Sequence, residues 1–289
     1  MSTQHAARRL LSESAATLRL ALPLVLGQLA AVAMNVVDSV LAGQHGALTL
    51  ASVAVGSALW TVVILLLLGI LMAIPPSVSQ LDGAGKRSEI GPLFRQALWL
   101  GLAISLLLLG LTRFSAPLLS LMGIAEDVAV GARAFLEAVA WGAPALAVQL
   151  CCRYLSEGVG RTRPTMVFGI AGLVLLIPLG WWLMHGGLGL PGYGAAGLGA
   201  ATAIMIWVQA VGFLWWLRRG PAYADLRLFE RFDPPDPRLL GQLLRLGLPL
   251  GVAVMMEGLL FVASALLIGG MGALAVAAHQ IAINIASVL

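Results

Sequence analysis

The chain has 289 residues, of which 60% are hydrophobic and only 10% are charged, and its formal net charge is +4. Soluble domains are about a quarter charged, so this composition excludes an ordinary soluble protein and predicts an integral membrane protein. Apolar stretches of about 20 residues can cross a bilayer as helices, because a helix satisfies its own backbone hydrogen bonds in lipid. We therefore expect an all-α, polytopic helical bundle.

Hydropathy predicts the membrane helices in chain order, at about residues 17–42, 49–74, 92–113, 129–153, 164–186, 194–217, 242–269 and from 272 onward. Alternate loops carry 15 of the 17 Lys and Arg residues, and only Arg113 and Arg133 lie on the other side. The positive-inside rule therefore places the N-terminus in the cytoplasm. Because membrane topology accounts for the basic excess, we expect no nucleic-acid partner.

A polar stretch with four prolines follows the sixth predicted helix. Proline fixes the backbone and removes a hydrogen-bond donor, so this stretch reads as a connection and not as a span. We predict a six-helix N-terminal lobe over 1–219, a cytoplasmic linker over 220–241 and the start of a C-terminal lobe over 242–289.

A repeat links the two predicted lobes. The phrase LRLALPL at 18–24 returns 226 residues later as LRLGLPL at 244–250, and the glycines of LAGQHGAL and LIGGMGAL keep the same register. An even number of helices separates the copies, so both begin on the same side, which indicates parallel repeats of the kind found in secondary transporters. The second copy stops inside an apolar run. We expect a truncated second repeat, and favour a fragment over a shortened gene product.

Glu257 is the clearest candidate for membrane chemistry. It lies twelve residues after Arg245, about 18 Å along a helix and therefore near the bilayer midplane. An ionisable group at that depth usually faces a cavity and marks an ion or substrate path. Such a carboxyl group can carry a proton or hold a cation or a drug amine. The alternative is a neutral acid bonded to a neighbouring carbonyl group.

Two further acids fall within predicted helices. Asp38 lies about 28 Å from Arg19 by the helical rise, in the outer part of the first helix, and Asn35 one turn earlier could share its site. A solvated or turn-capping aspartate is the alternative. Glu137 follows Arg133 by four residues, and this spacing predicts a helical ion pair without a functional role.

The remaining candidates are expected along a substrate path. They are Gln28, Met256, His279 and Gln280. Methionine suits a promiscuous pocket because its side chain is soft and adaptable. A buried histidine is more often a core group than a ligand. Nucleotide-binding, HExxH and GxSxG motifs are absent, so we expect no enzyme, no metal site and no cofactor apart from a coupling ion.

Four phrases resemble the multidrug and toxin extrusion (MATE) family, in particular its NorM-like branch. They are LALPLVLGQLAAVAMNVVDSVLAG at 20–43, EGVGRTRPTM at 157–166, GYGAAGLGAATA at 192–203 and the segment that begins GLPLGVAVMMEG at 247. The resemblance implies a MATE-like two-lobe architecture and multidrug efflux, in which cationic amphipathic drugs are exchanged for H⁺ or Na⁺. It also implies that Asp38 and Glu257 are the coupling acids and that Gln280 pairs with His279.

One departure from the family bears on the coupling ion. Many NorM-like members have asparagines around the IPL of the fifth helix, whereas this chain has Leu176 and Gly180 in LIPLG. Na⁺ requires several oxygen ligands and a proton requires one carboxylate, so we hypothesise that Asp38 is mainly a proton site.

These predictions together describe a monomeric drug transporter of the bacterial inner membrane, with membrane lipid as its other partner. The nearest alternative is a lipid-linked precursor flippase of the same superfamily, although the buried charges here are acids and not cations. A membrane-embedded enzyme would need converging catalytic groups near one membrane face. A structural subunit would tolerate neutralisation of both Asp38 and Glu257.

Overall fold

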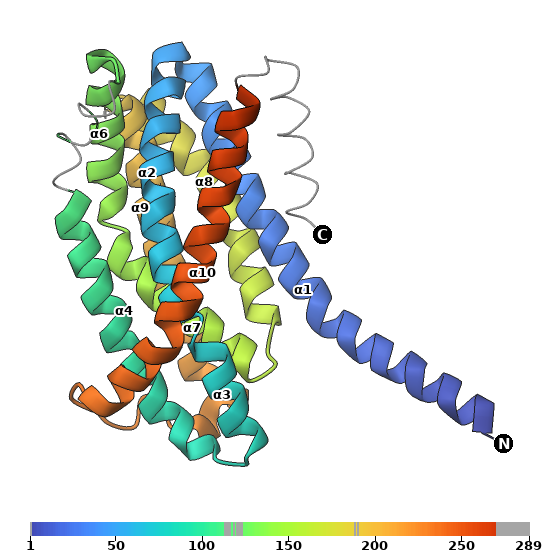
Figure 1. Ribbon diagram of the computed structural model, residues 1–289. Coiled ribbons are helices and arrows are strands. Elements are labelled where there is room, and N and C mark those ends of the chain that lie inside the picture. The colour runs from blue at the N-terminus through green and yellow to red at the C-terminus, as the bar shows by residue number, and fades with distance from the viewer. Residues whose placement is uncertain are drawn as a thin grey trace.

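The computed structural model describes residues 2–112, 117, 119, 124–187, 189 and 191–269, and every element within these ranges is helical. Labels follow Figure 1. The elements are α1 (Ser2–His45), α2 (Ala47–Leu71), α3 (Ile74–Gly83), η1 (Arg87–Glu89), α4 (Ile90–Thr112), α6 (Glu126–Ala140), α7 (Ala143–Gly158), α8 (Arg163–His185), α9 (Gly194–Arg219), η2 (Pro221–Leu226) and α10 (Pro237–Gly269).

The predicted polytopic bundle is confirmed. Six described helices are long and apolar enough to cross a membrane, and a seventh span results if the bent pair α6 and α7 is taken as one. These helices stand side by side in Figure 1. The span predicted from residue 272 onward lies outside the described residues.

Two predicted spans are broken where the chain carries proline. The second span continues beyond Leu71 into α3, which begins with Pro75 and Pro76 in its first turn. The fourth span bends by 52° between α6 and α7, where Pro144 occupies the first turn of α7. Proline lacks the N–H that would continue the helical ladder, so each break falls where a new helix starts.

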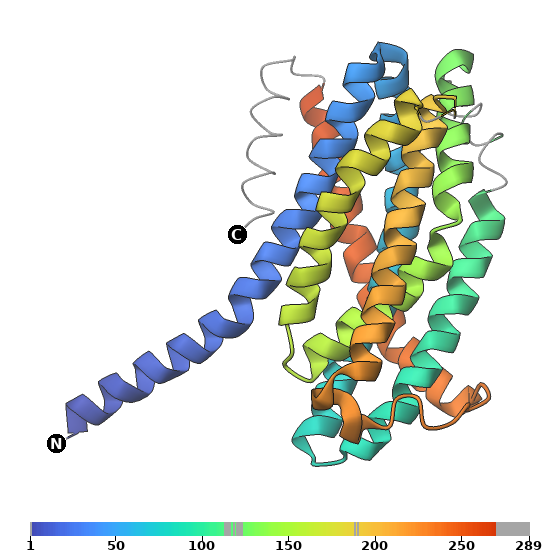
Figure 2. The same ribbon diagram turned by 180° about the vertical axis from the view of Figure 1, so that it is seen from behind.

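The first helix begins earlier than the hydropathy predicts. Its backbone is helical from Ser2, whereas the membrane-compatible part runs from Leu20 to His45. Both views show the first turns projecting away from the bundle (Figures 1 and 2). Hydropathy detects the span alone, whereas the preceding segment is rich in Ala, Arg, Leu and Ser, of which the first three favour helix outside the membrane as well.

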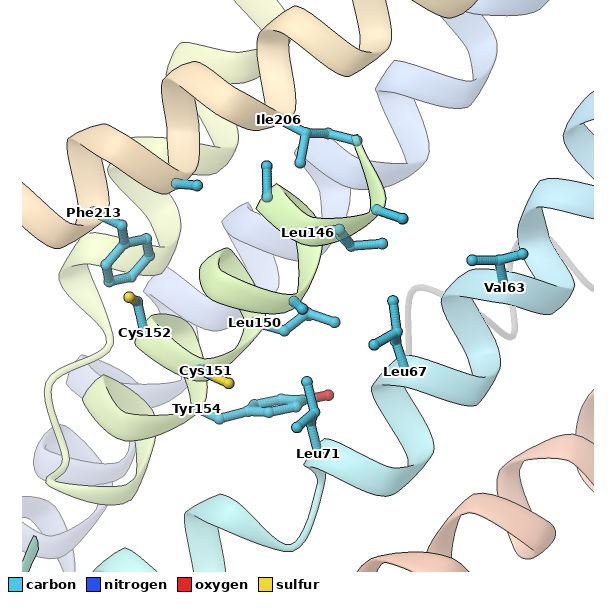
Figure 3. Close-up of a cluster of buried hydrophobic side chains, with 14 of the residues drawn as sticks. Val63, Leu67, Leu71, Leu146, Leu150, Cys151, Cys152, Tyr154, Ile206 and Phe213 are labelled. Atoms are coloured by element: carbon cyan, nitrogen blue, oxygen red, sulfur yellow. The ribbon is translucent and has the colours of Figure 1, made fainter. Parts of the chain in front are cut away.

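The core of the bundle lies where α7 meets α2 and α9 (Figure 3). Leu67 and Leu71 of α2 reach toward Leu150 of α7, and Phe213 of α9 covers Cys152. All five side chains are buried. Because lipid provides no hydrophobic drive between helices, this close side-chain packing stabilises the bundle.

The segment after α9 folds back onto the bundle. Tyr223, Leu226 and Leu228 are buried, and the Tyr223 hydroxyl donates a hydrogen bond to Oγ of Ser156 at 3.2 Å. The next membrane helix, α10, begins at Pro237, five residues before the predicted start at 242. The stretch predicted as a linker is therefore fastened to α7, and its position relative to the first bundle is fixed.

Candidate ion-coupling site

Glycine-mediated packing holds α1 against α8. A Cβ atom added to Gly169 would lie 3.4 Å from the Cα of Gly27, so the two backbones approach with no side chain between them. On the same contact, a Cβ atom at Gly27 would lie 3.2 Å from Cγ2 of Thr165. Small residues allow such close approach of membrane helices. The approach fixes the part of α1 that precedes Asp38.

Asp38 lies on the bundle-facing stripe of α1. Met34 is one turn before it and packs against the core, while Leu41 and Ala42, one turn after it, are buried. Residues three and four apart share one face of a helix, so Asp38 is placed between apolar neighbours. Its Oδ1 atom is buried and has no hydrogen-bond partner among the described residues. A buried polar atom without a partner is rare, and an ordered water or a bound ion is the usual explanation.

The surface of α8 beside this stripe is apolar. Leu176 is fully buried, and a Cβ atom at Gly180 would lie 2.9 Å from Cδ1 of Leu41 and 3.2 Å from Cδ1 of Leu198. Hydrocarbon therefore fills the space that a longer side chain at position 180 would need. Across the described ranges, His, Cys, Asp and Glu nowhere gather in a group of three or more that could hold a metal ion.

The second predicted acid lies on a different helix and in a different setting. Glu257 is exposed on α10, beside the 61%-exposed Met256, and it forms no ion pair with any described residue. The next residue, Gly258, faces Leu65 of α2. The described contacts do not join Glu257 to Asp38, so the two acids do not form one site in this structure.

The described candidates for a substrate path lie on two helices, α1 and α10. Gln28 and Asn35 are both exposed on α1. The carbonyl oxygen of Asn35 accepts a hydrogen bond from Oγ of Ser39 at 2.9 Å, and the structure shows no bond from Asn35 to Asp38. His279 and Gln280 lie outside the described residues.

A hydrogen-bonded glutamine pair, of which Gln209 is buried and Gln149 partly buried, was not predicted from the sequence. Nε2 of Gln149 on α7 donates to Oε1 of Gln209 on α9 at 3.1 Å, and Nε2 of Gln209 donates to the carbonyl oxygen of Phe168 on α8 at 2.8 Å. Gly172 provides the room, because a Cβ atom there would overlap Gln209. An isolated glutamine inside an apolar window is the signal that could have revealed this connection between three helices.

The predicted ion pair on α6 is confirmed. Nε of Arg133 lies 2.8 Å from Oε1 of Glu137, and both side chains are substantially exposed. Glu137 therefore has a local partner on its own helix, unlike Asp38. This contrast separates a structural acid from a candidate site within the same bundle.

The described helices define a multi-pass membrane protein with a carboxyl group inside an apolar span. The MatE family model matches residues 23–182, more than half of the chain, and the chain belongs to this family of transport proteins, which are not enzymes. The predicted MATE resemblance is thereby confirmed.

The chain is 49% identical over 98% of its length to a probable multidrug resistance protein NorM of Xanthomonas campestris pv. campestris. It is also 40% identical over 97% of its length to multidrug resistance protein PmpM of Pseudomonas aeruginosa.

The chain covers 62% of that NorM protein and 59% of PmpM, so it spans about 60% of the length of the curated relatives it matches. Solved structures show the same fold. A MOP superfamily transporter from Pyrococcus furiosus superposes with a TM-score of 0.80 at 22% identity, over 94% of this chain and 60% of that one. An outward-facing multidrug resistance MATE transporter gives 0.76 at 21% identity, over 88% of this chain and 56% of that one.

Proposed function

We propose that this chain forms the N-terminal lobe and the first part of the C-terminal lobe of a secondary multidrug efflux transporter. It would export cationic amphipathic drugs in exchange for an ion, without another cofactor. Support comes from relatives at 40–49% identity that are named multidrug resistance proteins. The observation that carries the proposal is the partnerless Oδ1 atom of Asp38 on the bundle-facing stripe of α1.

The proposed coupling ion is the proton. Hard cations are held by several oxygen ligands, whereas Leu176, Gly180, Leu41 and Leu198 present only hydrocarbon near this stripe. A proton needs a single carboxylate oxygen. Proton binding at Asp38 would compete with a cationic drug and, by favouring one of two states, would shift an inward–outward equilibrium. Glu257 is the second proposed coupling acid, on the first helix of the other repeat.

The proposed location is the bacterial inner membrane, with the N-terminus in the cytoplasm and the protein acting as a monomer. The orientation is supported by the 15 of 17 basic residues in alternate loops. Residues 1–219 would form one lobe, 220–241 its cytoplasmic connection and 242–289 the beginning of the second lobe.

The test is efflux of a fluorescent cationic dye from cells that express the full-length protein carrying this sequence. Asp38→Asn and Glu257→Gln are compared with wild type under separately imposed pH and Na⁺ gradients. Glu137→Gln is the matched control, because Glu137 is also an acid on a membrane helix but has Arg133 as its partner. We expect pH-driven export to be lost in the first two variants and retained in the control. Unchanged export in both Asp38→Asn and Glu257→Gln would refute the coupling role of these acids. Export that depends only on the Na⁺ gradient would refute the proton as the coupling ion.

A further inference from the structure

The segment between η2 and α10 lies across the beginning of α4. In both views the orange chain crosses the base of this helix (Figures 1 and 2). Arg95 of α4 fastens it: Nη1 donates to the carbonyl oxygens of Arg227 and Leu228 at 2.7 and 3.0 Å, and Nε donates to Oδ2 of Asp233 at 2.8 Å. Trp99 Nε1 adds a bond to the carbonyl oxygen of Asp233 at 3.0 Å.

A groove of about 400 Å³ remains between this segment and α4, and we call it the linker groove. Its wall is mostly hydrocarbon, and its apolar members are Leu98, Trp99, Leu102, Leu228, Phe229 and Phe232. Its charged members are Arg95, Arg231 and Asp233. An apolar trough with charge at its edge matches an amphipathic ligand that has a polar head and a hydrocarbon tail.

The groove begins along the part of α4 that is long and apolar enough to cross a membrane. The apolar span of this helix runs from Arg87 to Gly110, and further along it Leu106 and Leu107 are 58% and 65% exposed at the bundle surface, where lipid is the solvent. Leu98 and Leu102 therefore lie at a depth where the groove opens toward acyl chains.

Aromatic side chains form the outer edge of the linker groove. Phe232 is 80% exposed and stacks edge-on with Trp99 at 5.6 Å, and Phe229 is 46% exposed and stacks edge-on with Phe94 at 6.3 Å. Aromatic rings of this kind are enriched at the boundary between hydrocarbon and headgroups. The segment is thus held where the headgroup layer begins.

The charge at the groove is positive. One carboxylate, Asp233, faces two guanidinium groups, with Nη2 of Arg95 at 2.6 Å and Nε of Arg231 at 2.7 Å. The guanidinium group of Arg95 donates its hydrogen bonds to the segment between η2 and α10, whereas the Arg231 side chain is 70% exposed. The remaining positive charge lies at the mouth of the groove, where a lipid phosphate would sit.

We propose that the linker groove binds an anionic phospholipid of the cytoplasmic leaflet, with an acyl chain along Leu98 and Leu102 and the phosphate at Arg231. Anionic lipids are attracted to basic residues at this face of a membrane. The inference rests on the orientation proposed above, but it does not depend on drug transport or on Asp38.

The test uses quenching of Trp99 fluorescence in the full-length protein, reconstituted into vesicles of phosphatidylcholine and phosphatidylglycerol. Bromines are placed on the acyl chains of one lipid at a time, and the signal of Trp99 is obtained as the difference between the protein and its Trp99→Phe variant. The Trp99 signal is obtained in the same way for the Arg231→Gln and Phe232→Ser variants, each compared with its own Trp99→Phe double variant. Arg238→Gln is the matched control, since Arg238 is exposed at the start of α10 and does not line the groove.

We expect brominated phosphatidylglycerol to quench Trp99 about fivefold beyond its share of the bilayer, the factor expected for one surface arginine. Arg231→Gln should remove this preference, Phe232→Ser should weaken quenching by both lipids, and Arg238→Gln should leave both unchanged. Equal quenching by the two lipids would overturn the proposal. An equal loss of the phosphatidylglycerol preference in Arg231→Gln and Arg238→Gln would also overturn it, because diffuse surface charge would then explain the preference. A dimer that forms in the wild type and is abolished by Arg231→Gln and Phe232→Ser would overturn it as well, because a second copy of the chain would then occupy the groove. Thermal melting of each variant confirms that it is folded.

Discussion

The two copies of the repeated phrase begin helices with different surroundings. Helix α1 packs mainly on α8, whereas α10 packs mainly on α2. With the 226-residue offset, Asp38 corresponds to Ser264, and Glu257 corresponds to Ala31. Each copy therefore carries an acid at a position where the other has none. The repeated segment forms a helix in both copies, whereas its acid lies at a different position in each.

The repeated segment differs at two positions that face α2 in the second copy. Gly247 and Gly251 of α10 occupy the positions of Ala21 and Val25 in α1. A Cβ atom on Gly69 of α2 would collide with the Cα of Gly251, and one on Gly247 would collide with the Ile70 carbonyl oxygen. Glycine at positions 69 and 247 therefore allows α10 and α2 to touch through their backbones, as small residues do in membrane bundles, whereas a Cβ atom on Gly251 would make only ordinary contacts at 3.5 Å.

The largest effect is expected where this backbone contact is blocked. Gly69→Val should separate α2 from α10, because the added side chain meets backbone that cannot rotate away. We expect a loss of about 3 kcal/mol or more in stability, the upper range for overpacking. Thermal unfolding of the purified full-length protein, followed by size-exclusion chromatography with fluorescence detection, measures it.

The matched control is Gly110→Val on α4. Gly110 also lies on a membrane helix, but a Cβ atom there meets nothing within 4 Å. Its thermal midpoint should stay close to that of the wild type. Similar midpoints for Gly69→Val and Gly110→Val would show that the close crossing of α2 and α10 is not required.

The next effect concerns the apolar setting of Asp38 in the first copy. Gly180→Asn alone should be poorly tolerated, because its Cβ would lie 2.9 Å from Cδ1 of Leu41. Combined with Leu41→Ala, the amide would gain room and add an oxygen ligand to the region. We expect the double variant to gain Na⁺-dependent dye export that the wild type lacks, with Leu41→Ala alone as its control. Equal Na⁺ dependence in the wild type would contradict the proton assignment.

A smaller effect is expected in the segment that connects the two copies. The hydrogen bond from Arg95 lowers the pKa of Asp233, with a further contribution from the charge of Arg231. Asp233→Asn removes the counter-charge of the buried Arg95 guanidinium, and a buried cation without a partner is unfavourable. Trypsin cleavage after Arg227 and Arg231 should accelerate severalfold at neutral pH in inside-out vesicles.

The stabilisation that the Asp233 carboxylate provides should depend on pH. Because the pKa of Asp233 is lower in the folded protein, its carboxylate stabilises the fold above the ordinary aspartate pKa. That contribution is lost as the pH falls through the lowered value, so the thermal midpoints of wild type and Asp233→Asn should converge in acid. Glu230→Gln is the control, because Glu230 is exposed and lies 3.7 Å from Arg227. A difference in thermal midpoint that persists in acid would exclude the carboxylate as its cause.

The sequence predicted the spans and the repeat well because both are local or periodic signals. Long apolar runs have no stable alternative to helix in lipid, so their number and order follow from hydropathy. The 52° bend between α6 and α7 was missed because hydropathy alone does not register the proline at position 144. The settings of Asp38 and Glu257 could not be predicted, since each depends on which neighbour the helix packs against. Those contacts are decided by glycines far apart in the chain, such as Gly69 and Gly251.

The smallest effect is expected for the acid that has a partner on its own helix. Glu137→Gln breaks the exposed pair with Arg133, and exposed pairs at this spacing contribute only about 0.3–0.5 kcal/mol. The thermal midpoint should therefore hardly move, and dye export should be unchanged. Asp38→Asn should show the reverse pattern, with the fold intact and pH-driven export lost, because its Oδ1 atom has no described partner to lose. If Glu137→Gln and Asp38→Asn reduce export alike, the presence or absence of an ion-pair partner does not predict which acid is needed for export.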